Sequence, residues 1–368
     1  MTTLHTDLFD SDSMELFDQH IALVHGKFNK IQADLEHKRA REAAHLLGLT
    51  EAQWVAAQCG SLRSIRLFGN PIDILKEIPR LGAVMALTRN DYCVHERHGR
   101  YLNVQTDHPV GLVLGPDIDL RMFYSNWTHA WAVEENKRSS IQFFDHAGQA
   151  VHKIYCTSQS NTAEYVAIIG EYAAEPVWPI PFSYPVDQSR TFLPNCQSDT
   201  SIDEHALFRQ AWLSMTDTHD FYPLIRRFNL TRLAALRAAG DDLAQRVTPE
   251  VIEEMLDSVA RSGLPIMCFV GNRGMIQIHT GAIKNIQRKG PWLNVLDEKF
   301  NLHLDTTKID SVWIVSKPTS DGWVTSMEVF AESGELIVQF FGARKPGSAE
   351  LTVWRELMLG LCVETIAP

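Results

Sequence analysis

The sequence predicts an α+β protein built by tandem duplication, in which each half is a large antiparallel β-sheet with a helical group packed on one side. The main observation is an internal repeat: residues 84–133 align without a gap with residues 266–315, 182 positions later. Eleven of the fifty aligned positions are identical, where ordinary composition would supply about three. The identical pairs are Met85/Met267, Asn90/Asn272, Gly99/Gly281, Asn103/Asn285, Gln105/Gln287, Pro109/Pro291, Val113/Val295, Leu114/Leu296, Leu120/Leu302, Trp131/Trp313 and Val133/Val315. A period of this length is the size of a domain and exceeds that of solenoid repeats.

A second observation is a pair of β-hairpin patterns in equivalent places. Residues 141–155 and 324–342 each form two β-rich arms around a small-residue turn. Phe144 in the first corresponds to Phe330 in the second, now with an offset of 186. The change of offset predicts a four-residue insertion, which we place at the turn over residues 318–323.

The remaining elements are expected in the same order in both halves. Residues 28–59 have helical spacing, with Thr50 as the N-cap of a helix that starts at Glu51. A long β-rich stretch follows. The elements expected in the second half are helices over 205–240 and 249–261, strands from 265 onward and a final helix over 348–361.

Five prolines lie between the halves, within residues 176–194. Proline disfavours helix interiors and central strands alike, so this stretch is predicted to be a linker. The predicted organisation is an N-terminal extension (1–25), a first repeat (26–175), a Pro-rich linker (176–204) and a second repeat (205–368) that carries most of the functional site.

Composition excludes several classes of protein. The net charge is −11 and no stripe of Lys and Arg is present, which argues against nucleic acid as a partner. No apolar run has the length of a bilayer span, and the first twenty residues are acidic where a secretory signal would be basic and then apolar. We therefore expect a cytoplasmic protein that is not embedded in a membrane.

Metal and nucleotide motifs are also missing. The six cysteines form no CxxC or CxxCH, so the sequence encodes neither a zinc knuckle nor covalently attached c-type haem. The sequence His95-Glu96-Arg97-His98 is one residue short of an HExxH motif, and we interpret it as a surface loop. His129, His146 and His152 are interpreted as scattered surface residues. No GxGxxG, Walker loop or GxSxG is present, so nucleotide cofactors and serine hydrolysis have no support.

Functional residues are expected at positions where the duplicated halves differ. Arg232 follows the N-cap Thr231, at the positive end of a helix dipole where a cation is disfavoured, and the first half has Glu51 at the matching place. His219, thirteen residues before Arg232, is also near a helix start, where the neutral imidazole that ligates metals is favoured. The first half has Lys38 at the matching place. The alternative is that His219 is a surface or capping residue.

The chain resembles a known family, the HemS-type haem-handling proteins, also called hemin-degrading factors. The resemblance covers nearly the whole chain from about residue 25. It is carried by AVMALTRNDYCVHERHG at 83–99, DLRMF at 119–123, DTH at 217–219 with Arg232 beyond it, and KPTSDGWVTSMEVFAESGELIVQFFGARKPG at 317–347. The fold it implies has two similar halves, with haem in a cleft between the C-terminal sheet and the C-terminal helices.

The resemblance also implies site residues. His219 would be the axial ligand of the haem iron, and Arg232 would face the other side of the haem, placed to bond a water, hydroxide or oxygen on the iron. The remaining implied haem contacts are Arg121, Phe123, Lys317, Gln339, Phe341 and Arg344. Phe341 departs from the family pattern, since family members often carry Tyr there. Phe123 and Phe341 suit an apolar slot, and Arg121, Lys317 and Arg344 suit the propionates.

Simpler interpretations of the same residues stay open. Phe123 and Phe341 could be ordinary core aromatics, and Lys317 and Arg344 could be solvated charges. Two functions fit the implied ligand, haem b. One is a haem-trafficking protein that receives haem from an inner-membrane importer and passes it on, for example to a downstream haem oxygenase. The alternative is an enzyme that opens the porphyrin ring with an external reductant and with Arg232 as a catalytic residue. A purely structural duplicated β domain is the third class.

Overall fold

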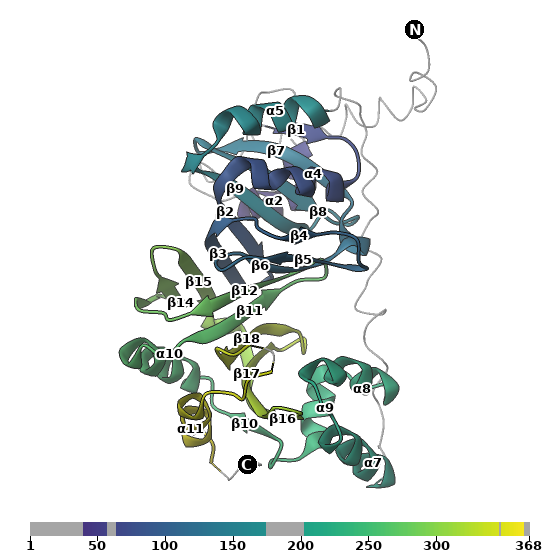
Figure 1. Ribbon diagram of the computed structural model, residues 1–368, viewed down its shortest axis with the longest axis vertical. Coiled ribbons are helices and arrows are strands. Elements are labelled where there is room, and N and C mark those ends of the chain that lie inside the picture. Colours follow the sequence, from purple (N-terminus) through teal and green to yellow (C-terminus); the bar gives the residue numbers. More distant parts are fainter. Residues whose placement is uncertain (1–39, 57–63, 174–201, 346, 364–368) are drawn as a thin grey trace.

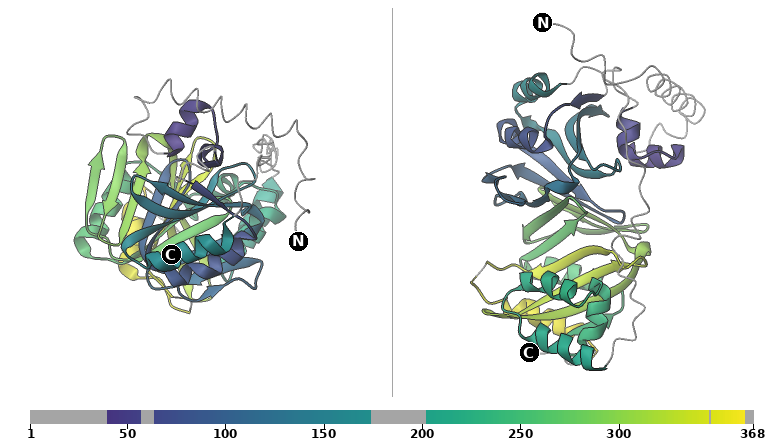
Figure 2. Two further views of the ribbon diagram at one scale, coloured as in Figure 1. Left: turned by 90° about the horizontal axis from the view of Figure 1, so that it is seen from above. Right: turned by 90° about the vertical axis from the view of Figure 1, so that its right-hand side faces the viewer.

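The computed structural model describes residues 40–56, 64–173, 202–345 and 347–363. The described residues form two antiparallel sheets of nine strands each, with helices packed on them (Figure 1). Most elements of the first half lie at one end of the long axis and most elements of the second half at the other (Figures 1 and 2). The predicted α+β fold, with two large antiparallel sheets, is confirmed. The N-terminal extension and nearly all of the predicted linker lie outside the described residues, as do Lys38, Cys59 and Cys196.

The first sheet combines six strands of the first half with three of the second. In spatial order its strands are β1 (Ser64–Leu67), β7 (His129–Glu135), β8 (Arg138–Phe144), β9 (Ala150–Ser160), β2 (Gly82–Arg89), β3 (Cys93–Arg100), β15 (Phe300–Asp305), β14 (Trp292–Leu296) and β13 (Ile286–Lys289).

The second sheet combines six strands of the second half with three of the first. Its strands are β10 (Ala244–Val247), β16 (Ile309–Thr319), β17 (Gly322–Ala331), β18 (Leu336–Gly342), β11 (Ile266–Gly271), β12 (Met275–Gly281), β6 (Asp119–Phe123), β5 (Val110–Leu114) and β4 (Val104–Gln105). The halves therefore exchange three strands, which the sequence did not predict. In this sheet the strands of the two halves meet at β6 and β12, where Arg121 is paired with Ile276.

Two of the repeated asparagines tie the halves together. The Asn90 amide donates to the carbonyl oxygens of Gly271 (3.2 Å) and Ile337 (2.7 Å), and the Asn272 amide donates to those of Arg89 and Val151, both at 2.9 Å. Each asparagine thus satisfies backbone acceptors of the other half. This explains why the same residue recurs at both positions of the repeat.

The predicted four-residue insertion is confirmed. Strand β7 ends at Glu135 and β8 begins at Arg138, whereas β16 continues to Thr319 and β17 begins at Gly322. The offset is 182 before the turn and 186 after it. With the hairpins aligned in this way, β16 and β17 each extend two residues further toward the turn than β7 and β8. The added length extends the strand that carries Lys317.

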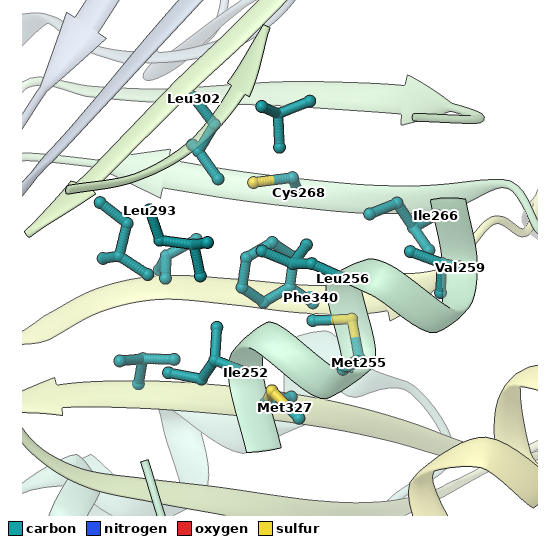
Figure 3. Close-up of a cluster of buried hydrophobic side chains, with 14 of the residues drawn as sticks. Ile252, Met255, Leu256, Val259, Ile266, Cys268, Leu293, Leu302, Met327 and Phe340 are labelled. Atoms are coloured by element: carbon teal, nitrogen blue, oxygen red, sulfur yellow. The ribbon is translucent and has the colours of Figure 1, made fainter. Parts of the chain in front are cut away.

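The helices of the second half divide between the two faces of their sheet, which differs from the expected packing on one side (Figure 1). On one face α10 (Val251–Ser262) and α11 (Thr352–Gly360) cover an apolar core (Figure 3). On the other face lie α7 (Ile202–Leu213), α8 (Phe221–Arg227) and α9 (Arg232–Ala239). Both faces of the central strands are apolar enough to take a layer of helices.

The first half repeats this arrangement among its described helices. They are α2 (Ala40–Leu47), α3 (Glu51–Ala56), α4 (Pro71–Glu77) and α5 (Thr162–Tyr172). Thr50 caps α3 as predicted, since its hydroxyl accepts from the Gln53 N–H at 3.2 Å. Helix α3 packs on Trp131, Val133 and Phe144, while α4 and α5 cover the opposite face.

Two predictions about histidines were wrong. The residues 95–98 lie in strand β3, not in a surface loop, and the His95 side chain is fully buried. His152 is also buried, with Nδ1 2.8 Å from the Thr88 hydroxyl and Nε2 2.6 Å from the Tyr101 hydroxyl. Strand exchange places β3 between β2 and β15, in the middle of a nine-stranded sheet, and this buries His95, whereas His152 lies on β9 between β8 and β2.

These buried histidines are expected to make stability depend on pH. Burial lowers the pKa of His152 and His279 to about 3 and that of His95 well below its usual value. Histidine in the unfolded chain titrates near 6.5, so below that pH the unfolded state binds more protons and stability falls. Between pH 7.5 and pH 5.5 each such histidine should cost about 1.4 kcal/mol in the free energy of unfolding.

Denaturant unfolding at the two pH values tests this, with His95→Gln as the variant. The repeat already has the buried Gln277 at the position of His95, so glutamine fits this environment. The variant should lose about 1.4 kcal/mol less than the wild type on acidification. The exposed His108→Gln serves as control and should behave as wild type. Equal losses in wild type and His95→Gln would contradict the account.

Candidate functional site

The predicted site residues of the second half share one face of the second sheet. Directly paired residues of neighbouring strands lie on the same face. Gln339 is paired with Glu328 on one side and Phe269 on the other, and Phe341 with Ser326 and Met267. This is the face that α7–α9 cover at its β16–β17 end.

A buried carboxylate, Glu328, is the centre of the site. Its side chain is 0% exposed, and it accepts hydrogen bonds from Arg232 Nε at 2.7 Å and Nη2 at 2.8 Å. Lys317 Nζ donates to the same carboxylate at 2.7 Å. Phe221 covers the two cations, with Lys317 Nζ 4.6 Å and the Arg232 guanidinium carbon 5.1 Å from its ring centroid. The predicted residues Arg232 and Lys317 are thus brought together by a residue that was not predicted.

The charges of this cluster influence one another. Burial alone would raise the pKa of Glu328, but Arg232 and Lys317 outweigh it and hold that pKa well below its usual range. Burial, with Arg232 beside it, lowers the pKa of Lys317 to about 8, although Glu328 acts in the opposite direction. The cluster therefore holds two cations and one anion at neutral pH. Glu328 also offsets the unfavourable position of Arg232 at the first residue of α9.

His219 lies just before Phe221, in a short 3-10 helix (Thr218–Asp220) capped by Asp217 and Asp220. Its side chain is 93% exposed. Asp217 accepts from the His219 backbone N–H at 2.8 Å and lies 2.6 Å from the ring Nδ1. A carboxylate at Nδ1 fixes the proton there and leaves Nε2 as a free ligand atom. The Asp217 pKa is lowered, first by the hydrogen bond from that N–H.

Arg121 and Phe123 reach the same face through the exchanged strand β6. Arg121 is paired with Ile276 and Phe123 with Val110, three strand spacings from the Gln339 strand, or about 14 Å at 4.8 Å each. Arg121 bonds Asp119 at its partly exposed end. The first half thus contributes directly to the sheet that carries the other site residues.

The last predicted residues lie around the end of β18. The Phe341 ring packs edge-on against Phe269, with centroids 5.2 Å apart. Gln339 Nε2 and Arg344 Nη1 are buried and have no hydrogen-bond partner among the described residues. Arg344 Nη2 lies 3.5 Å from Asp321, at the β16–β17 turn. Unpaired buried donors of this kind are suited to an anionic or polar ligand group.

A cavity of about 830 Å³ borders the site at Gln339 and Phe269. It extends between the halves to Arg41 on α2 and to the loops around Asn90 and Asn272. His219, Arg232 and Lys317 do not line it. We therefore centre the site on the Glu328 cluster and His219, because the ligand chemistry lies there.

The first half has different chemistry at the equivalent place. Glu51, the counterpart of Arg232, forms a buried ion pair with Lys153, the counterpart of Gln339. With the offset of 186, Gln142 stands in place of Glu328. Among the described residues, the first half therefore has no counterpart of the Glu328 cluster at the equivalent place.

Sequence reasoning missed Glu328, Asp217 and the aromatic residues Phe221 and Trp212, the last with its ring centroid 5.9 Å from Lys317 Nζ. One signal was available for Glu328. It occupies an inward position of a strand whose neighbours are apolar, and a lone buried carboxylate requires cationic partners. The Thr-His pair after Asp217 also matches a capped turn.

The fold and site define a class: duplicated α+β proteins with two strand-exchanged sheets and a His/Arg site under the second helical group. The chain belongs to the family of the haemin-degrading HemS.ChuX domain, whose model matches residues 48–172 and again 229–361. One match lies in each half of the chain.

Curated relatives match over nearly their full length. The chain is 38% identical over 344 residues to the hemin transport protein HmuS of Yersinia pestis, covering 92% of this chain and 97% of the relative. Among solved structures, holo-PhuS, a heme-binding protein from Pseudomonas aeruginosa, has a TM-score of 0.85 and 39% identity, covering 93% of this chain and 99% of that one. The heme degrading enzyme ChuS of Escherichia coli O157:H7 has a TM-score of 0.83 and 33% identity, covering 92% and 98%.

Proposed function

We propose that this protein is a cytoplasmic haem-binding protein that handles imported haem, and that its ligand is haem b. The observation that carries the proposal is the Asp217–His219 pair, an exposed imidazole with its Nδ1 beside a carboxylate and no hydrogen bond to its Nε2 from the residues that the structure describes. Outer-shell carboxylates of this kind orient metal-bound histidines. Supporting evidence comes from the family membership and from relatives described as hemin transport or heme-binding proteins. None of the described helices combines the length and apolarity needed to cross a membrane.

The residues present fit a haem between α8–α9 and the sheet. His219 would supply the axial nitrogen, and Phe123 and Phe341 would line the apolar slot. Arg344, with its unpaired buried Nη1, and Arg121 would meet the propionates, with Lys317 as a third cation. Gln339 would donate its unpaired Nε2 to a polar edge of the ligand. Arg232 would offer its guanidinium to a group bound by the iron.

Between the two candidate functions we favour trafficking: haem would be received from an inner-membrane importer and passed to an acceptor such as a haem oxygenase. The specific observation is Phe341, which packs on Phe269 and offers no hydroxyl proton donor. Bound haem would supply iron redox chemistry, but ring opening also requires an external reductant and a proton donor. The enzymatic alternative keeps Arg232 as its catalytic residue and is favoured by the ChuS likeness.

Phe341→Tyr separates these functions. The wild-type protein, loaded with haem and given ascorbate and catalase, should transfer haem to an excess apo-acceptor with little loss of total haem. The tyrosine variant gains a hydroxyl and should break haem down roughly tenfold faster or more, since a placed proton donor commonly contributes at least that much. Pyridine haemochrome assay measures both outcomes.

The exposed Phe68→Tyr adds a hydroxyl far from the site and is the control. It should behave as wild type. Breakdown by the wild type at the rate of Phe341→Tyr, with no transfer, would support the enzymatic function instead.

A further inference from the structure

A buried tyrosine and a buried histidine are hydrogen-bonded in the core of the first half. The Tyr101 hydroxyl lies 2.6 Å from Nε2 of His152, and Nδ1 of His152 lies 2.8 Å from the Thr88 hydroxyl. All three side chains are at most 1% exposed. Burial raises the pKa of Tyr101 well above its usual value and lowers that of His152 to about 3, so at neutral pH the pair is a phenol and a neutral imidazole. The phenol therefore donates to Nε2, which is a base aimed at the phenolic proton.

The second half shows that the fold does not need these polar groups. The residues at the places of Thr88, Tyr101 and His152 are aliphatic there. They are Val270, Ile283 and Val338, and all three are fully buried. A core position costs least when it is apolar, since every buried polar group must find a partner. The hydrogen-bonded Tyr–His pair is therefore a special feature of the first half.

Aromatic rings connect this pair to the haem slot proposed above. The Trp127 ring centroid lies 6.4 Å from that of His152, and the Tyr124 centroid lies 6.3 Å from that of Trp127. Tyr124 directly follows Phe123, which would line the slot. The Trp127 indole N–H donates to the Gly274 carbonyl oxygen at 2.8 Å, which fixes the ring between its two neighbours.

This series of rings is also specific to the first half. Thr306 and Ile309 stand at the places of Tyr124 and Trp127 in the second half, and neither has an aromatic ring. The two halves thus differ at every position of the path from the slot to Tyr101.

The chemistry of these side chains gives the path a direction. Tyrosine and tryptophan can lose one electron to a strong oxidant and regain it from a neighbouring ring. A phenol that loses an electron becomes a strong acid, so it is oxidised most easily where a base lies within hydrogen-bond reach. The Tyr124 hydroxyl is buried without a hydrogen-bond partner among the described residues, and the Trp127 N–H meets only a peptide carbonyl. Tyr101, with the imidazole of His152 at its hydroxyl, is the favoured end of the path.

We propose that Tyr101 is a redox-active tyrosine and that Trp127 and Tyr124 carry one electron from it to the haem site. The oxidant is the oxidising equivalent left at the haem site when hydrogen peroxide reacts there. Tyr101 loses one electron, its hydroxyl proton moves to Nε2 of His152, and the electron is consumed at the haem site. One electron from a thiol or ascorbate in solution, with return of the proton from His152, restores the phenol. The path would thereby keep bound haem intact.

The link to haem rests on the proposed function, because it takes Phe123 as part of the haem slot. The ligand-free protein tests the Tyr–His pair without that link. The probe is a ruthenium(III) polypyridyl oxidant generated by a flash in the presence of persulfate, after which the sample is frozen for EPR spectroscopy. Wild type should give a tyrosyl radical, and Tyr101→Phe should lose most of the signal.

Matched variants make this measurement specific. Trp127→Phe keeps an aromatic ring but removes a readily oxidised one, so the yield of the radical should fall. Tyr222→Phe changes an exposed tyrosine on α8 and should give the wild-type signal. Equal signals from wild type and Tyr101→Phe overturn the proposal.

The role of His152 has its own readouts. His152→Val introduces the residue type that the second half has at this place, and it should abolish the Tyr101 radical because the base is gone. Where this variant fails to fold, the wild-type protein in D2O supplies the test. The radical should form more slowly there, since a proton moves together with the electron. An unchanged rate in D2O, or an unchanged radical in folded His152→Val, overturns the role of His152.

The haem-loaded protein tests the link to the site. Under hydrogen peroxide, Tyr101→Phe should lose haem several-fold faster than wild type in the pyridine haemochrome assay, with unchanged haem affinity. Equal rates of haem loss overturn the link. Absence of the Tyr101 radical, with haem binding that depends on His219, defeats this inference alone. Haem binding indifferent to His219, with the Tyr101 radical present, defeats the proposed function alone.

Discussion

His219→Ala is expected to lower haem affinity by more than about a hundredfold and to shift the Soret band. Loss of an outer-shell partner of a metal ligand alone costs about 10- to 100-fold, and here the ligand itself is removed. Asp217→Ala should show the smaller effect, about 10- to 100-fold, because Nε2 remains but the ring loses its orienting carboxylate. Hemin titration followed by absorbance measures both variants against wild type.

His205→Ala on α7 is the matched control, since it removes another histidine from the same helical group. It should leave affinity and spectrum unchanged. The double variant His219→Ala/His205→Ala tests whether His205 substitutes for the lost ligand. Unchanged affinity and spectrum in both His219→Ala and the double variant would remove His219 from the site.

Glu51→Gln is expected to cause the largest loss of stability, about 3–5 kcal/mol in the free energy of unfolding, because it leaves Lys153 buried without its carboxylate. Lys153 is held charged by Glu51, which opposes the cost of burial and raises its pKa. Urea denaturation at pH 7.5 measures the effect. Haem binding at low temperature should be unchanged, since the pair lies in the first half.

Two further variants make this test specific. Glu51→Leu with Lys153→Met replaces the ion pair by apolar side chains and should recover wild-type stability to within about 1 kcal/mol or exceed it. Glu42→Gln on the exposed side of α2 should have no effect. A loss below about 1 kcal/mol in Glu51→Gln would show that the pair does not hold α3 on its sheet.

Much of the fold could be predicted because a sequence pattern that is weak in one half is repeated in the other. The hairpins and the insertion that lengthens β16 and β17 follow from comparing one half with the other, and helix α10 (Val251–Ser262) was expected at 249–261. Strand exchange could not be predicted, since a strand pattern does not specify which sheet the strand joins. Its consequences include the buried His95 and the contribution of Arg121 to the second sheet. A second half cut out on its own would lack β4–β6, so it is no test of the site.

Sequence reasoning singled out residues at element ends and missed a residue inside a strand. His219 and Arg232 stood out because a histidine and a cation at helix starts conflict with the helix dipole. Glu328 lies in the apolar-looking strand β17, and its role depends on partners 11 and 96 residues away in the sequence. Only the register shows that Glu328 faces α9 and Lys317. The haem roles of these residues stay predictions.

The most direct test of the account is the stoichiometry of haem binding. Hemin is titrated into the ligand-free wild-type protein while the Soret band is followed, with His219→Ala in parallel. The account predicts one saturable equivalent per chain, lost or altered in the variant, because the cluster and its histidine belong to the second half while Glu51 and Lys153 occupy the equivalent place in the first. Two equivalents per chain, or no specific Soret shift in the wild type, would contradict it.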